Sequence, residues 1–103
     1  MGYDMTEIQK FEKKPEGYRL EQNYPNPFNP KTSIQYYLPQ GCKITLEVLD
    51  IRGRTVKVLV NDMKSMGQHT SIFDSSTLSS GIYFYRLTTS TGFQKSNKML
   101  LVK

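Results

Sequence analysis

Hydrophobic and polar residues alternate along most of the chain after residue 30, which is the pattern of half-buried β-strands. The clearest run, SIQYYLP over residues 33–39, groups Ile34, Tyr36 and Leu38 on one face and leaves Tyr37 on the other. Five more runs follow, some weaker: KITLEVLD (43–50), RTVKVLV (54–60), QHTSIFD (68–74), GIYFYRLTT (81–89) and FQKSNKMLLVK (93–103). The pattern therefore predicts about six or seven short strands.

The alternation also predicts which side chains share the apolar face of each later run. Tyr37 and Phe84 fall opposite these faces, so their surroundings are left open. The predicted apolar faces are Ile44, Leu46 and Val48, then Val56, Val58 and Val60 opposite Thr55 and Lys57, then Tyr83, Tyr85 and Leu87.

Turn residues separate the runs. Gly53 in DIRGR supplies the positive φ of a tight turn, and the STG triplet at residues 90–92 predicts a further hairpin. No apolar helical period appears after residue 17. Regularly spaced short strands with turns between them predict an all-β fold, an immunoglobulin-like antiparallel β-sandwich.

A proline-rich segment, NYPNPFNP, precedes the first run. Pro25, Pro27 and Pro30 fix φ, remove amide donors and bias the preceding residues toward extended geometry. Asparagine side chains can bond nearby backbone amides, so we expect a rigid coil that loses little entropy on ordering. Tyr24 and Phe28 are expected to cover an open end or side of the sheet, as core residues would.

The first 17 residues, MGYDMTEIQKFEKKPEG, carry little apolar surface and are predicted to be a flexible linker or leader. Residues 18–103 are then one domain with a modest core. We find no apolar core of an N-terminal export signal, and no run of the about 18 apolar residues that a transmembrane helix needs. We therefore expect that this chain carries no export signal of its own.

The formal net charge is +5, from 14 Lys and Arg against 9 Asp and Glu. Three lysines against four acidic residues give residues 1–17 a charge of −1, so the remainder carries +6. A basic domain could attract nucleic acid, an anionic glycan or a lipid surface, but a solvated lysine-rich surface explains the charge more simply. We expect no nucleic-acid partner. Arg52 and Arg54 could grip an acidic partner, although a solvated hairpin tip is the simpler interpretation.

Candidates for catalysis or metal binding are few. His69 is the only histidine, and no local pattern joins it to a nucleophile or carboxylate. Asp50, Asp62 and Asp74 lack calcium-loop spacing and are expected to end strands or start turns. Cys42 is the only cysteine, so no intrachain disulfide is possible, and one His with one Cys is too few for zinc. We expect no enzyme activity, cofactor or metal.

Two motifs near the end of the chain carry more information. In TLSSGIYFYRL, Leu78 can anchor a loop, Gly81 permits a sharp entry into the strand, and Tyr83 can bury its ring while its hydroxyl finds a backbone partner, as in a tyrosine corner. The last motif is either a strand that completes the sandwich or a segment that another protein recognises, and both can hold. Its residues are Lys98, Met99, Leu100, Leu101, Val102 and Lys103.

The stretches LEQNYPNPFNPKTSIQYYLP, VLDIRGRTVKVLVN, GQHTSIFD, LSSGIYFYRL and KMLLVK resemble, in order and spacing, the type A C-terminal sorting domain of type IX secretion substrates. That family is also similar to the immunoglobulin-like domain of flagellar hook-capping proteins. The resemblance spans about residues 18–103. Phe73 stands where Trp or Phe is expected, and Cys42 where small or polar residues are usual.

The resemblance implies a non-catalytic module at the C-terminus of large exported proteins of Bacteroidetes-like bacteria. Such modules pass through the periplasm and are recognised by the outer-membrane machinery, and a sortase-like peptidase commonly removes them and joins the cargo to surface lipopolysaccharide. The partners expected are this machinery, the peptidase and an upstream cargo domain, with a secreted or cell-surface location. We expect residues 98–103 to carry the recognition and NYPNPFNP to form a rigid boundary between cargo and signal.

Two other functions compete with this interpretation. One is an accessory domain that binds carbohydrate beside a catalytic domain, with tyrosine rings as a stacking platform, although core packing explains most of the tyrosines. The other is a structural spacer of the hook-cap type. The terminal motif favours sorting, because a glycan-binding domain has no need of its last residues.

Overall fold

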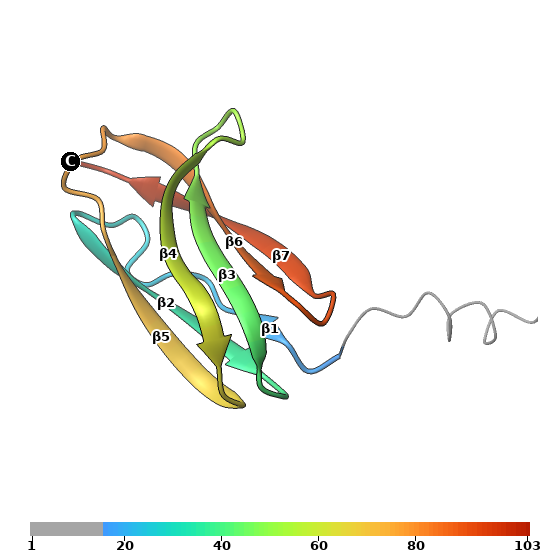
Figure 1. Cartoon of the computed structure of the whole chain (residues 1–103). Coiled ribbons are helices and arrows are strands. Elements are labelled where there is room, and N and C mark those ends of the chain that lie inside the picture. Colours follow the sequence, from blue (N-terminus) through green and yellow to red (C-terminus); the bar gives the residue numbers. More distant parts are fainter. Residues whose placement is uncertain (1–15) are drawn as a thin grey trace, which may run out of the picture.

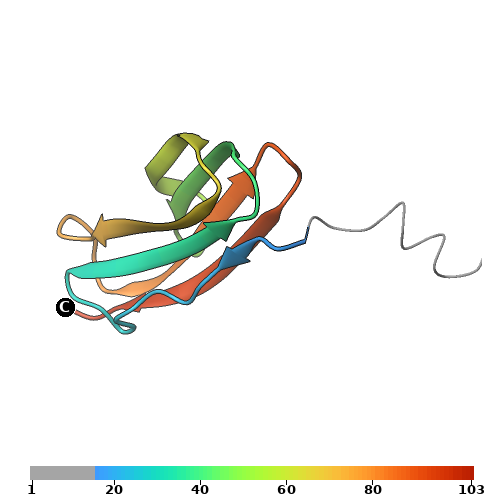
Figure 2. The ribbon, with the colours of Figure 1, turned by 90° about the horizontal axis from the view of Figure 1, so that it is seen from below.

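The computed structural model describes residues 16–103, which form two β-sheets packed face to face (Figures 1 and 2). The three-stranded sheet has the order β1-β2-β5 and the four-stranded sheet the order β4-β3-β6-β7, with antiparallel pairing throughout. The strands are β1 (Arg19–Leu20), β2 (Lys31–Leu38), β3 (Cys42–Leu49), β4 (Thr55–Lys64), β5 (Gly67–Asp74), β6 (Gly81–Thr89) and β7 (Gln94–Leu101).

This architecture confirms the predicted all-β, immunoglobulin-like sandwich of seven strands. Among residues 16–103 no helix occurs, and so none that is long and apolar enough to cross a membrane. The linker predicted for residues 1–17 lies, except for its last two residues, outside the described part of the chain.

The core lies between the two sheets, and most of it consists of the side chains that the alternation placed inward on β2, β3 and β6. Burial of one face of each sheet drives this arrangement, because every second side chain of a strand points to the same face. Phe84 and Tyr37, opposite those faces, are half-buried. The buried residues that confirm the predicted faces are Ile34, Tyr36, Leu38, Ile44, Leu46, Val48, Tyr83, Tyr85 and Leu87.

The predicted apolar face of β4 is correct at Val60 and wrong at Val56 and Val58. Val60 lies opposite the buried Leu46 and packs against the core, whereas Val58 pairs with the outward-facing Glu47 and is 49% exposed, and Val56 is 39% exposed. The cause is a register shift between Leu46 and Glu47, which inserts one extra residue on β4 and reverses the inward side of the strand. The alternation of apolar and polar residues in the sequence shows no break at such a bulge, but the side chains beyond it point to the opposite face.

Turn chemistry accounts for the sharp connection between β3 and β4. Asp50 Oδ1 accepts the backbone N–H groups of Arg52 (2.9 Å) and Arg54 (3.0 Å), and Gly53 provides the predicted positive φ of 82°. The Arg54 N–H bond is the main reason that the pKa of Asp50 lies below its usual value. Arg54 Nε also donates to Asp50 Oδ2 at 2.9 Å, so this arginine braces its own turn.

Of the two other aspartates that were predicted to end strands or start turns, one does so and one does not. Asp74 ends β5 as expected, but Asp62 lies inside β4, because that strand continues to Lys64 beyond the alternating run.

The tyrosine corner is present, since the Tyr83 hydroxyl donates to Ser79 O at 2.7 Å while the ring is buried. Leu78 packs against the core from the same loop, as expected.

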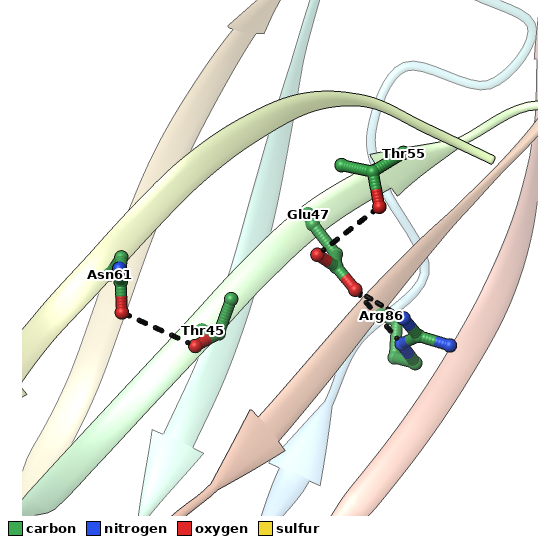
Figure 3. Close-up of polar contacts among 5 residues, drawn as sticks. All are labelled: Thr45, Glu47, Thr55, Asn61 and Arg86. Atoms are coloured by element: carbon green, nitrogen blue, oxygen red, sulfur yellow. Dashed lines mark hydrogen bonds and ion pairs between the residues drawn. The ribbon is translucent and has the colours of Figure 1, made fainter.

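Polar side chains form a network on the outer face of the four-stranded sheet (Figure 3). Glu47 on β3 forms an ion pair with Arg86 on β6, whose Nε donates to Oε1 at 3.1 Å, and Thr55 on β4 donates to Oε2 at 3.4 Å. These contacts join three strands on the side away from the core.

Candidate functional site

The terminal segment, residues 98–103, comprises the end of β7 and the two residues that follow it, and β7 is an edge strand of the four-stranded sheet. Met99 and Leu101 point into the core and are fully buried, whereas Leu100 is 38% and Val102 49% exposed. Lys103 closes the segment, because its backbone N–H donates to Ser80 Oγ and its Nζ to Ser76 O, both at 2.9 Å. The segment is therefore a fixed part of the sandwich with one outward apolar side.

The clasp, residues 22–28, lies along the outer edge of this segment. Phe28 N–H donates to Leu100 O at 3.0 Å and Val102 N–H donates to Phe28 O at 3.1 Å, which makes a parallel bridge between Phe28 and Leu101. Leu100 N–H donates to Asn26 Oδ1 at 2.9 Å. Gln22 Nε2 donates to Lys98 O at 2.7 Å. The clasp thus binds the backbone of β7 that no neighbouring strand covers.

A buried polar cluster anchors the beginning of the clasp. The Tyr85 hydroxyl donates to Glu21 O at 2.6 Å and accepts the backbone N–H of Asn23 at 2.7 Å and Asn97 Nδ2 at 3.2 Å. Burial raises the pKa of this hydroxyl, while the bonds from Asn97 and Asn23 offset part of the rise. The hydroxyl therefore stays protonated and holds the clasp to β6 and β7.

The Asn23 side chain extends this cluster to the other sheet. Its Nδ2 donates to Thr32 Oγ1 at 2.9 Å, and Thr32 in turn donates to Pro25 O at 2.9 Å. Asn23 and Thr32 are both buried. A buried amide and hydroxyl that are fully paired stabilise one conformation of the backbone between them.

The two aromatic residues of the clasp behave differently from each other. Phe28 is 2% exposed and packs against Phe73 with ring centroids 6.0 Å apart, which confirms its predicted covering role. Tyr24 is 80% exposed, so its predicted core position is wrong. Tyr24 attaches through its backbone, which exchanges two hydrogen bonds with Ser33 of β2, and this pairing directs the ring to solvent.

The polar residues that hold the clasp were not found from the sequence. Asparagine side chains were expected to bond nearby amides, yet Asn26 accepts from Leu100, 74 positions later. No local sequence pattern indicated a role for Asn23, Thr32 or Asn97, because their hydrogen-bond partners lie in distant parts of the sequence. Pro25, Pro27 and Pro30 are exposed, and their missing N–H groups leave the outer side of the clasp poor in donors.

The outward side of the terminal segment borders a small groove of about 130 Å³. Ile82 on β6 is the register partner of Leu100, and both are exposed apolar residues on the same face of the sheet. The lining residues are Asn26, Ile82, Lys98, Met99 and Leu100. This groove joins the predicted recognition residues to the clasp.

The remaining chemical candidates are dispersed. His69 stacks on Tyr36 with ring centroids 5.3 Å apart, and its Nε2 lies 2.8 Å from Ser65 O. Cys42 is a buried free thiol at the start of β3. Within residues 16–103, no group of three or more His, Cys, Asp or Glu side chains is placed to hold a metal ion.

A second hollow, of about 430 Å³, lies on the outer face of the three-stranded sheet. The Arg19 guanidinium carbon lies 4.8 Å from the centroid of the Tyr37 ring, and Gln68 Nε2 donates to Gln35 Oε1 at 3.3 Å. Glu21 is 3.7 Å from Arg19 Nε. The hollow is therefore mostly polar, and its aromatic lining residues are Tyr36 and Tyr37.

Comparison with known proteins identifies the chain through its family. The family model of the secretion system C-terminal sorting domain matches residues 22–103, which begins at the clasp and includes the terminal segment. Neither the curated proteins nor the solved structures gave a match. The relation to hook-capping domains stays a prediction. Because the match covers most of the chain, this protein belongs to the family of secretion system C-terminal sorting domains, which are sorting signals for type IX secretion.

Proposed function

We propose that this domain directs an attached cargo protein through the type IX outer-membrane machinery and that the machinery binds the outward side of the terminal segment. The family match over residues 22–103 carries the proposal. The outward side chains support it, because Leu100 and Val102 are apolar and exposed, whereas the other apolar residues of the segment, Met99 and Leu101, are fully buried.

The face of the sheet is a better recognition surface than the edge of β7. Backbone groups of Lys98, Leu100 and Val102 already bond to the clasp, so a partner meets them only after the clasp moves. Leu100 and Ile82 instead form an accessible apolar pair beside the charged Lys98. A small apolar centre with a polar rim is the usual anatomy of a protein interface.

In this proposal the domain itself carries out no reaction. A sortase-like peptidase removes it from the cargo, and the cargo becomes anchored at the cell surface. The family implies secretion and a cell-surface location. The clasp supports a role as a rigid boundary, because its buried tether at Tyr85 fixes the point where the chain enters the sandwich.

The test is an export assay of the whole 103-residue chain fused behind a signal peptide and a fluorescent protein in a type IX-competent host. Leu100→Asp and Val102→Asp place charges on the outward side and should abolish delivery to the surface or medium. Ile72→Asp is the matched control, since Ile72 is 57% exposed on β5, in the other sheet, and should leave delivery intact.

Circular dichroism must show that all three variants fold. Deleting residues 98–103 is a poorer test, because the deletion also removes the buried Met99 and Leu101 from the core. Normal export of folded Leu100→Asp and Val102→Asp variants would show that the machinery binds elsewhere. Whether cargo is cleaved and anchored is measured separately, from the mass of the delivered protein.

The polar hollow around Tyr37 favours carbohydrate binding as a second candidate function. Aromatic rings and planar amides are groups that can pack against and bond to a sugar, and Gln35 and Gln68 present their amides beside Tyr37. Titration with neutral disaccharides by NMR tests it. Chemical-shift changes near Tyr37 that disappear in Tyr37→Ala would support carbohydrate binding. If the disaccharides cause no such changes, sorting is the one proposed function that remains.

A further inference from the structure

We propose that the outer edge of β7, from Lys98 to Val102, is a strand-binding site that the clasp fills from within the chain, and that an extended segment of a partner protein can replace the clasp. This inference goes beyond the proposed function, because it concerns the edge of the strand and not its outward face.

The bonding pattern at this edge is that of a parallel strand. Phe28 brackets Leu101, donating to Leu100 O at 3.0 Å and accepting Val102 N–H at 3.1 Å. β7 pairs with β6 over eight consecutive positions without a register shift. In contrast, β4, at the opposite edge, has two register shifts. A long, regular edge strand can pair with another strand. β7 is such a strand, and the clasp occupies its edge.

The clasp is an incomplete ligand for this edge. Only Phe28 pairs through its backbone, whereas Asn26 and Gln22 reach Leu100 and Lys98 through side-chain amides. Pro25 and Pro27 fix φ at about −65°, away from the value of a regular strand. A regular strand presents the N–H and C=O of every second residue to one edge, so with Phe28 beside Leu101 it would bond to Lys98 O and Leu100 N–H through the backbone of residue 26, where the clasp uses side chains.

The contact also has a side-chain socket. Phe28 is almost fully buried beside Phe73, so a replacing segment needs one large apolar side chain at this position. Exposed Lys98 precedes the site along β7 and Lys103 follows it, which favours a segment with acidic residues at its ends. The fitting partner is therefore an extended acidic peptide with one large apolar residue, parallel to β7.

Opening the clasp need not unfold the sandwich. Upstream of Asn26, Asn23 is held by Thr32 and Tyr85, and the Tyr24 backbone by Ser33. Downstream, Pro30 O accepts both the backbone N–H and the hydroxyl of Ser75. Both ends stay anchored away from the β7 edge when the middle of the clasp leaves it.

Peptide complementation tests the proposal. The probe is a synthetic peptide of residues 22–30 carrying Pro25→Thr and Pro27→Thr, added to a Phe28→Ala domain whose socket is empty. We expect it to bind with NMR shift changes confined to β7 and its neighbours and to raise the melting temperature. It should bind about tenfold tighter than the peptide with its prolines, because without them residue 26 can take strand geometry and bond to β7 through its backbone.

Several controls make the result decisive. A domain with Gln22→Ala and Asn26→Ala keeps Phe28 and serves if Phe28→Ala does not fold, and it too should bind the peptide more tightly than the intact domain does. Tyr24→Ala changes the exposed ring of the same clasp and should behave like the intact domain. The same peptide with Asp in place of Phe28 should not bind.

Two results would overturn the proposal. The first is that neither opened domain binds the peptide at millimolar concentration, or that the shifts lie away from β7. The second is a concentration-dependent dimer of the intact chain, which would show that the edge exchanges clasps with a second copy and not with a foreign strand.

Discussion

The hydroxyl of Tyr85, on β6, accepts the backbone N–H of Asn23 at 2.7 Å, and through this bond the chain that precedes β2 is tied to the opposite sheet. The same oxygen donates its proton to Glu21 O and also accepts from Asn97. One buried atom therefore holds the beginning of the clasp and the last strand together.

Tyr85→Phe should lower the free energy of unfolding by about 1–3 kcal/mol, because it leaves the buried Asn23 amide without its partner. Urea denaturation at neutral pH measures this. Tyr24→Phe removes a hydroxyl from an exposed ring and should change stability by less than about 0.5 kcal/mol. Equal effects of the two substitutions would contradict the tether.

Stability should also fall at high pH. Burial raises the pKa of Tyr85 and of Tyr36 above the ordinary tyrosine value of about 10. The folded state therefore holds these protons more tightly than the unfolded state, so their contribution is complete below about pH 10 and is lost as pH rises toward the folded pKa. The difference in unfolding free energy between the intact chain and Tyr85→Phe should shrink above pH 10, and a constant difference would contradict this.

Phe28→Ala should cost about 3–5 kcal/mol, since it empties a buried site beside Phe73. Tyr24→Ala, in the same clasp, should cost little, because its ring is largely in solvent. Chemical denaturation of both variants checks the contrast. A large loss in Tyr24→Ala would mean that its ring packs in solution.

The turn at Asp50 should lose strength in acid. The Arg54 backbone N–H, with further bonds from Arg52 and the Arg54 side chain, holds the pKa of Asp50 below its usual value. The carboxylate therefore contributes stability above the ordinary aspartate pKa of about 4, and this is lost as pH falls through the lower folded pKa. Asp50→Asn should be less stable than the intact chain at pH 7 and match it near pH 2. A gap that persists in acid would show that charge is not involved.

The faces of β2, β3 and β6 were predictable because each strand has a buried and an exposed side along its whole length. β4 was not, because its register shift near Leu59 depends on how the strand meets β3 and leaves no mark in the alternation. Val58 therefore became exposed despite its apolar character. Periodicity predicts faces only where the pairing register is continuous.

The candidate site was predictable in location but not in mechanism. The terminal segment and Phe28 were both identified from the residues, yet nothing local showed that they touch. Gln22 and Asn26 bond to residues that follow 76 and 74 positions later, and such contacts follow only from the topology of the sheets. Tyr24 was misplaced for the same reason, since its backbone pairing with Ser33 decides where the ring points.

The chain enters the sandwich at one end, near residue 16, and the terminal segment finishes at the opposite end (Figures 1 and 2). A mechanical pull on the preceding chain, such as a moving cargo exerts, loads β1 and the clasp roughly along their own axes. The bonds of Glu21 to Gln35, Tyr24 to Ser33 and Tyr85 to Asn23 then share the force in shear and do not peel one after another. The sandwich can therefore bear tension at its entrance, and the bonds of Asn97 to Leu20 and Glu21 pass part of that load to β7.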